Sequence, residues 1–599
     1  MDGHRHGLST FTHSTLTPDA DRAPASTPPP VPTRSRAWAG GRWSRPGLGR
    51  ALVWGLAVGI PLLFLGVFFA WPVATLVARG FTTDGAVDLS AFADVFARQR
   101  TWRIIGLTLA QAGIATAIAL LLGIPGAYVL HRRQFRGRAA VRAFVTVPFV
   151  LPTVVVGVAF RSLLATGGPL DFLGLDGTFA AIIAALVFFN YALVVRTVGG
   201  LWEHLDPRTE QAARALGASP LRAFVSVTLP ALAPAIASAA SLVFLFCATA
   251  FGAVLVLGGM RYGTIETEIW IQTTQFLDLR AASVLSVVQL VIVAGALAVA
   301  GRARRTRERA LSLAAPAGGA QPLRLRSGVD AAAAGVTALV VALIALPLVS
   351  LVVRSLRTPT GWGLGNYVAL GTTGGSNALT VTVWEAAANS LRIALDATVM
   401  AVVVGGLVAL VVSRRPRRRS ARRAVSLLDA VFMLPLGVSA VTVGFGFLLT
   451  LDHPFGLDVD LRRSALLVPI AQAVVAVPLV VRTVLPVLRA IDPRLREAAA
   501  TLGAGPGRVL ASVDLAMTVR ALGLAVGFAF AVSLGEFGAT SFLARPDRPT
   551  LPVVIFKLIG RPGAENHGMA LAASVLLALV TAGIIAVAER LRGPAGGEL

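Results

Sequence analysis

Two short polar stretches of this chain nearly repeat each other and carry most of its candidate functional residues. Residues 193–217 read LVVRTVGGLWEHLDPRTEQAARALG, and residues 479–503 read LVVRTVLPVLRAIDPRLREAAATLG. A constant offset of 286 residues aligns the two without a gap. Acidic and amide side chains beside alanines suit docking into a groove on another protein, because small residues let another backbone approach closely. The candidate contact residues are Glu210, Gln211, Ala212, Ala213, Gly217, Glu497, Ala498, Ala499 and Gly503.

Each polar stretch has the start and stop signals of a short helix. Asp206 and Pro207 predict a helix start in the first copy, and Asp492 and Pro493 predict the same in the second. A glycine follows each helix and can adopt the left-handed conformation that ends it. One such loop could be a plain connection between two other helices. Two matched copies weaken that alternative.

Other residues that could do chemistry are few. Glu536 is an acid inside an apolar run and a candidate for lining a path through it, and Asn190 is a second candidate. Glu536 could instead cap a glycine-rich break, and Asn190 could simply join neighbouring helices. The single cysteine, Cys247, predicts no disulfide and no thiol chemistry. We expect no metal site, no resident cofactor and no enzymatic activity.

The composition predicts an all-α integral membrane protein. The chain has 599 residues, of which 55% are hydrophobic and only 14% are charged. Its net charge of +24 comes almost entirely from arginines beside apolar segments. This is typical of loops on the cytoplasmic side of a membrane and argues against nucleic-acid binding. Residues 1–50 lack apolar periodicity and predict a disordered cytoplasmic tail.

Twelve apolar runs approach the length of about 20 residues that a membrane-spanning helix needs. They lie near residues 51–78, 104–130, 143–160, 177–195, 231–257, 281–300, 331–353, 393–413, 430–450, 464–481, 519–544 and 567–588. An even number of spans in each half puts the arginine clusters, both polar stretches and both termini in the cytoplasm.

The domain organisation follows from the repeat. We expect a first half over residues 51–300 and a second over residues 329–599, joined by a cytoplasmic linker at 301–328. Six spans per half make the two halves parallel repeats, related by a pseudo-twofold axis along the membrane normal. Weaker marks of the repeat are AFGA at 250–253 and EFGA at 536–539.

The two polar stretches resemble the coupling-loop signature of permease subunits of binding-protein-dependent ABC importers. The signature reads QAARALGASPLRAFVSVTLP at 211–230 and EAAATLGAGPGRVLASVDLA at 497–516. The first copy has Gln211 where the family usually has Glu, and the second has Ala516 where the family usually has Pro. The resemblance covers about residues 98–300 and 385–590.

This resemblance implies that the two halves form one translocation path and that each loop docks on one subunit of an ATPase dimer. The chain has one lysine, Lys557, and no phosphate-binding loop. ATP and its Mg²⁺ would therefore be bound by a separate cytoplasmic partner. The chain would lie in a bacterial cell membrane. An extracytoplasmic binding protein would deliver the substrate to it.

The fused arrangement of two halves resembles the thiamine and ferric-iron importer group. GTIETEIWIQTTQFLDLRAASVLSVVQL at 263–290 and DRPTLPVVIFKLIGRPGAENHGMALA at 547–572 resemble thiamine permeases. SLGEFGAT at 533–540 resembles molybdate and sulfate permeases as well. We expect thiamine or a related small cation, with ferric iron as the alternative. An ion-driven secondary transporter is the alternative of another class, since it can have the same twelve spans.

Overall fold

The structure is a computed structural model that describes residues 48–83, 86–259, 261–307, 321–322, 328–414, 419–456, 458 and 460–590. The chain divides into a unit of residues 1–53 and a unit of residues 54–599. Most of the predicted tail and much of the predicted linker lie outside the described residues. The second unit is helical apart from three two-stranded pairings and contains both halves of the repeat.

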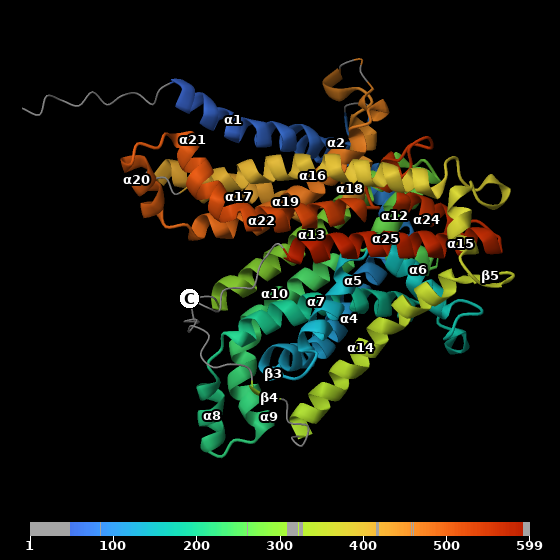
Figure 1. Cartoon of the computed structure of the whole chain (residues 1–599). Coiled ribbons are helices and arrows are strands. Elements are labelled where there is room, and N and C mark those ends of the chain that lie inside the picture. Colours follow the sequence, from blue (N-terminus) through green and yellow to red (C-terminus); the bar gives the residue numbers. More distant parts are fainter. Residues whose placement is uncertain are drawn as a thin grey trace, which may run out of the picture. The chain divides into compact units, whose positions relative to one another are not determined.

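The helices follow one order in the two halves (Figure 1). Those of the first half are α1 (Leu48–Leu65), η1 (Gly66–Ala70), α2 (Trp71–Phe81), α3 (Ser90–Ala97), α4 (Gln99–Ala127), η2 (Tyr128–Arg132), α5 (Arg138–Val150), α6 (Thr153–Leu164), η3 (Asp171–Leu173), α7 (Phe179–Glu203), α8 (Pro207–Ala215), α9 (Pro220–Ala223), η4 (Phe224–Thr228), α10 (Leu229–Ala248), α11 (Gly252–Gly258), α12 (Ile265–Thr274) and α13 (Leu279–Arg307). Those of the second half are α14 (Gly328–Ser355), α15 (Gly365–Val368), α16 (Val383–Ser413), α17 (Arg419–Met433), η8 (Leu434–Gly437), α18 (Ala440–Thr450), α19 (Leu467–Ala490), α20 (Pro493–Thr501), α21 (Pro506–Val509), η11 (Leu510–Leu515), α22 (Ala516–Leu534), α23 (Thr540–Leu543), α24 (Leu551–Ile559) and α25 (Ala564–Arg590). Short 3₁₀ turns at Ala369–Gly371, Gly375–Asn377, Pro454–Gly456 and Leu461–Arg463 complete the loops.

The strands are only two residues long. β1 (Thr82–Thr83) and β2 (Ala86–Val87) form one antiparallel pair, and β5 (Arg357–Thr358) and β6 (Gly361–Trp362) form another. β3 (Arg133–Gln134) pairs in parallel with β4 (Gln321–Pro322), which belongs to the linker between the halves. Residues 321–322 of the linker therefore lie beside β3, which follows α4 and η2.

The prediction of an all-α membrane protein is confirmed, but the count of twelve spanning helices is not. Within the described residues, ten helices are long and apolar enough to cross a membrane. The exceptions are the third predicted span of each half. In the first half this span is α5 and α6, which meet at an angle of 104°. In the second half it is α17 and α18, separated by the 3₁₀ turn η8.

Proline explains both breaks. Pro152 lacks a backbone N–H, and the residue before it, Leu151, is extended with φ −68° and ψ 140°. In the second half, Pro435 lies in η8, and Ser439 then starts α18 by accepting hydrogen bonds from two backbone N–H groups. α17 has 15 residues and α18 has 11, so neither is long enough to pass as a span by itself.

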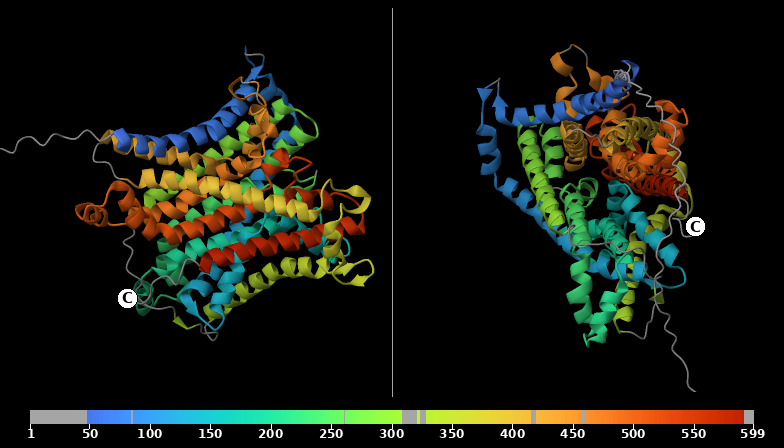
Figure 2. Two further views of the ribbon diagram at one scale, coloured as in Figure 1. Left: turned by 45° about the horizontal axis from the view of Figure 1, so that its top comes forward. Right: turned by 90° about the vertical axis from the view of Figure 1, so that its left-hand side faces the viewer.

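The first long helix of each half packs across the boundary between the halves. α14 contacts α4 and α6 of the first half as well as α25 of its own. α2 contacts α18 of the second half as well as α13 of its own. The two halves therefore share helix contacts along their length. The loops that contain α8 and α20 project at the same end of the unit, whereas β5 and α15 lie at the other end (Figures 1 and 2).

Glycines set the closest helix contacts. α16 and α19 pack so tightly that a Cβ atom on Gly405 would lie 2.9 Å from Cβ of Val480. The neighbouring Gly406 has no atom within 4 Å of the same position. This adjacent pair separates the effect of packing from the effect of glycine itself.

We predict that Gly405→Ala lowers the free energy of unfolding by about 1–3 kcal/mol, because the added methyl overpacks the contact with Val480. Gly406→Ala should change it by about 1 kcal/mol or less, in the stabilising direction, because alanine favours the helix. Thermal unfolding in detergent measures both. Equal destabilisation by the two variants would contradict the packing argument.

Candidate functional site

The two polar stretches fold into matching helical loops. α8 is capped by Asp206, whose carboxylate accepts a hydrogen bond from the backbone N–H of Arg208 at 2.9 Å. α20 is capped in the same way by Asp492 and the N–H of Arg494, also at 2.9 Å. An acid at this position satisfies a free N–H group and interacts well with the helix dipole.

Both loops end in the same left-handed turn. Gly217 has φ +89° and Gly503 has φ +86°, a conformation that other residues adopt at a cost. The next backbone N–H of each loop, that of Ala218 or Ala504, donates back to the helix at 3.1 or 3.0 Å. The sequence prediction of a capped helix ended by glycine is therefore confirmed in both copies.

The loops expose equivalent side chains. Gln211 and Ala212 in α8 are exposed, as are Glu497 and Ala498 in α20. Ala213 and Ala499 are half-buried against the remainder of their loops, and Glu210 is half-buried too. The docking role of these residues stays a prediction, but all of them lie at one end of the unit (Figure 1).

The most exposed apolar residues of these loops were not among the contact residues predicted from the sequence. Leu216 is 90% exposed and Leu502 is 88% exposed, each immediately before the turn glycine. Their signal was present in the repeat, because 286 residues separate them. Each leucine therefore leaves nearly all of its apolar side chain in contact with solvent.

A cavity of about 250 Å³ lies between the two halves, next to the helix breaks. Residues from both halves line it, including both candidate path residues, Glu536 and Asn190. The structure thus brings these two candidates to one cavity, away from the loops of α8 and α20. Phenylalanines supply much of the remaining surface: Phe149, Phe189, Phe246, Phe251 and Phe537.

Glu536 is held as a helix cap. Its carboxylate accepts hydrogen bonds from the backbone N–H groups of Ala539 at 2.7 Å and Thr540 at 3.0 Å. These N–H groups begin α23, after α22 has ended at Leu534. The geometry matches the alternative considered from the sequence, in which Glu536 caps a glycine-rich break.

Asn190 is fully buried in α7 and ties that helix to α10. Its side-chain amide donates to the carbonyl of Leu186 at 2.9 Å and to the sulfur of Cys247 at 3.3 Å. Its carbonyl oxygen has no hydrogen-bond partner in the structure. Asn190 therefore joins two helices and leaves a polar atom beside the cavity.

A second buried acid near the cavity was not found from the sequence. Glu266 in α12 is fully buried and accepts a hydrogen bond at 2.6 Å from Ser439, which lines the cavity from the other half. Burial raises the pKa of Glu266 to about 8. The repeat gave no signal, since Pro552 occupies the equivalent position in the second half.

Aromatic rings from equivalent positions meet beside the cavity. The rings of Phe251 and Phe537, which are 286 residues apart, stack with centroids 5.4 Å apart. Trp270 and Phe556 have the same offset and pack edge to face at 5.8 Å. Each Phe also contacts the aromatic residue of its own half, at 6.4 Å for Trp270 and 5.3 Å for Phe556. We call these four residues the ring cluster. Equivalent residues can meet in this way only at the axis that relates the halves.

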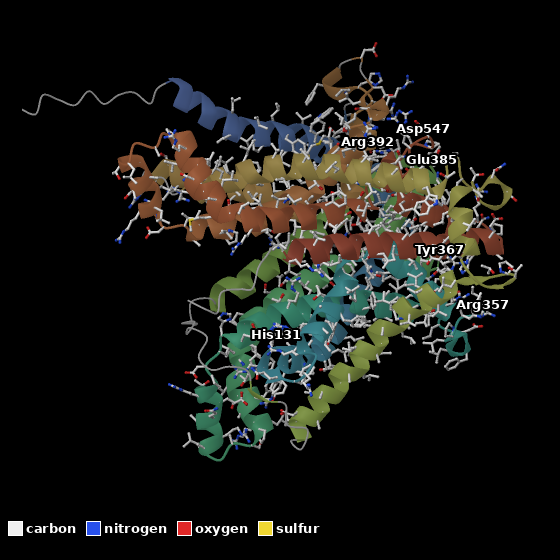
Figure 3. The ribbon with its side chains drawn as sticks, in the orientation of Figure 1. His131, Arg357, Tyr367, Glu385, Arg392 and Asp547 are labelled. Carbon is white, nitrogen blue, oxygen red and sulfur yellow. The ribbon has the colours of Figure 1, made fainter. Side chains whose placement is uncertain are left out.

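The end of the unit opposite α8 and α20 has a different character. Figure 3 shows Arg357, Tyr367 and Asp547 at this end, whereas His131 lies toward the repeated loops. Thr382 and Glu385 form a capping box at the start of α16, and the Thr380 hydroxyl donates to the carbonyl of Pro546. These bonds hold the loops at this end together.

Known proteins match this arrangement. A family model described as the binding-protein-dependent transport system inner membrane component matches residues 119–307. The thiamine transport system permease protein ThiP of Escherichia coli (strain K12) is 28% identical over 82% of this chain and 89% of its own length. The sulfate transport system permease protein CysT of Salmonella typhimurium is 32% identical over 39% of this chain and 86% of its own.

Among solved structures, a bacterial ABC transporter involved in the import of alginate aligns with 44% of this chain and 96% of its own, with a TM-score of 0.38 and 18% identity. The similarity to ThiP spans both halves, whereas that to CysT corresponds to a single half. This chain therefore belongs to the family of inner membrane components of binding-protein-dependent transport systems, as a permease with both halves in one polypeptide.

Proposed function

We propose that this chain imports thiamine or a closely related cation, driven by a separate cytoplasmic ATPase that docks on α8 and α20. The observation that carries the proposal is the pair of matched loops, each presenting a free leucine at the same end of the unit. A symmetric ATPase dimer needs two equivalent docking sites with similar exposed surfaces. Two loops built alike, one per half, meet that need.

The charge distribution supports a cytoplasmic position for the loop end. Arg132, Arg133, Arg138 and Arg142 lie in or near β3, the strand after α4 and η2 that pairs with β4 of the linker, and α17 carries further arginines. Arginines concentrate on the cytoplasmic side of membrane proteins. Both loops then face the ATPase, and the end with α15 and β5 faces the substrate-binding protein.

The cavity supports an aromatic cation as the substrate. Phenylalanine faces attract organic cations through their negative quadrupole, and flat rings pack well between them. The Glu536 carboxyl group lies at the wall, where its oxygens accept hydrogen bonds from two backbone N–H groups and from the Thr540 hydroxyl. Thiamine combines a positive charge with two aromatic rings, and ThiP is similar to this chain along both halves.

The ring cluster supports a closed path in this conformation. Its two pairs of equivalent rings pack on the axis beside the cavity, between α11, α12, α23 and α24. A small movement of the halves away from each other would separate both pairs together. We infer that closing and opening of the path involve this cluster.

Replacing both exposed leucines should remove the ATPase. We predict that the double variant Leu216→Asp with Leu502→Asp retains less than about a tenth of the ATPase that copurifies with the unmodified chain. The yield of the chain should not change, because both side chains are almost fully exposed. Phe172→Asp is the control, since Phe172 is 80% exposed in η3, which precedes α7. Undiminished ATPase binding by the double variant would contradict the docking role.

Truncating the central rings should open the path. We predict that Phe251→Ala with Phe537→Ala raises the leak of thiamine from proteoliposomes without ATP several-fold, because the stacked contact at 5.4 Å is lost. Phe64→Ala is the matched control, as it removes a ring contact at 5.5 Å with Phe68, away from the cavity lining. A leak equal to that of the unmodified chain would exclude closure by the ring cluster.

A further inference from the structure

Side chains at equivalent positions anchor the two repeated loops, but the acidic residue lies on the loop helix in the first half and on the helix that follows it in the second. In the first half, the carboxylate of Glu210 in α8 accepts a hydrogen bond from the hydroxyl of Thr228 at 3.0 Å. In the second half, the guanidinium of Arg496 in α20 donates to the carboxylate of Asp514 at 2.7 Å. The offset of 286 residues relates Glu210 to Arg496 and Thr228 to Asp514. The contact is kept while the acid has moved from the loop helix to the helix that follows it.

Asp514 also reaches a third element. It is 2% exposed in η11, at the start of the long helix that continues as α22. Besides Arg496, it accepts a hydrogen bond from Arg414 at 2.8 Å. Arg414 directly follows α16, so one buried carboxylate joins the loop helix to two membrane helices. Ionic hydrogen bonds of this kind are about twice as strong as neutral ones and gain strength away from water.

The first loop is tied to the equivalent helices less firmly. Arg132, at the end of η2 after α4, donates to the backbone carbonyl of Leu205 at 3.3 Å and attracts Glu210 electrostatically. The direct side-chain contact of Glu210 is the bond to the neutral hydroxyl of Thr228. Neither loop helix has a fully buried residue, so these polar contacts decide how each loop is held.

We propose that Arg496, Asp514 and Arg414 are positioning residues that make the second loop the stiffer link, passing movement of the ATPase to α16 and α22. The first loop follows the ATPase with more freedom, through the bond between Glu210 and Thr228. The two loops thus divide the coupling unequally, although their exposed surfaces are alike. This inference rests on the proposed docking of an ATPase on both loops.

The test exchanges the two anchors. Asp514→Thr alone leaves Arg496 and Arg414 facing each other without the carboxylate. Adding Arg496→Glu recreates the arrangement of the first loop, with an acid on the loop helix beside a threonine and an arginine. The reciprocal pair is Thr228→Asp alone, which sets two acids side by side, and Thr228→Asp with Glu210→Arg, which recreates the second loop.

The readout is ATP hydrolysis stimulated by the loaded binding protein in proteoliposomes, together with the amount of ATPase bound to the chain. We expect Asp514→Thr to lower stimulation at least tenfold while ATPase stays bound, and the added Arg496→Glu, which gives the second loop the weaker anchor of the first, to recover only about a third of the stimulation of the unmodified chain. Thr228→Asp should lower stimulation less than Asp514→Thr does, and the added Glu210→Arg should restore it. A merely structural role would lower bound ATPase and stimulation together.

Arg414→Gln is a second variant that leaves Asp514 in place: it keeps the bond between Arg496 and Asp514 and removes the hydrogen bond that Arg414 donates to Asp514. It should leave the ATPase bound and reduce stimulation at least threefold. Double variants no better than the single ones, an exchanged second loop stimulated as strongly as the unmodified chain, or an Asp514→Thr chain stimulated within twofold of the unmodified chain would overturn the inference. If the unmodified chain binds no ATPase, the proposed function fails first, and the two failures are therefore distinguishable.

Discussion

The structure depends on satisfying backbone polar groups where helices break inside an apolar protein. A membrane offers no water to a free N–H or C=O group, so each break needs side chains placed to pair with it. Gln111 donates to the carbonyl of Cys247 at 2.8 Å and Gln289 to that of Ala248 at 3.1 Å, where α10 ends. Glu536 instead accepts hydrogen bonds from the backbone N–H groups of Ala539 and Thr540, where α23 begins. Because the breaks are stabilised in this way, the chain can leave a cavity between its halves and line it with rings rather than with a continuous helix wall.

The repeat then decides what is shared and what differs between the halves. Positions that meet at the axis stay aromatic, as Phe251 and Phe537 do, since each residue packs against its own equivalent. Positions away from the axis are free to diverge. The loop helix contributes the acid of the anchor in the first half and an arginine in the second, and Glu266 has only a proline as its counterpart. A fused chain can keep such differences, whereas a homodimer of one half would have to be identical on both sides.

The sequence predicted the loop helices well, because Asp–Pro, the alanines and the closing glycine are local signals that act within one turn. It also predicted ten of the spans from their length and apolar composition. The third span of each half is not one straight helix, because Pro152 and Pro435 interrupt the apolar run. In the first half, α5 and α6 are long and apolar enough for a span only when the bent pair is counted together. The sequence could not place Glu266 against Ser439 or Arg496 against Asp514, because such pairs depend on how distant helices pack. The offset of 286 residues also pairs Leu216 with Leu502 and Trp270 with Phe556, so these equivalences were visible in the sequence.

We propose that two matched loops couple a thiamine path to a separate ATPase. ATP hydrolysis by this chain can be measured in liposomes with its ATPase and binding protein, with thiamine and with ferric iron supplied separately. We expect stimulation by the thiamine-loaded binding protein and none by iron. Stimulation by iron alone would still indicate an ATP-driven importer but would contradict thiamine as its substrate. A chain that binds no ATPase and still transports thiamine along an ion gradient would contradict the account as a whole.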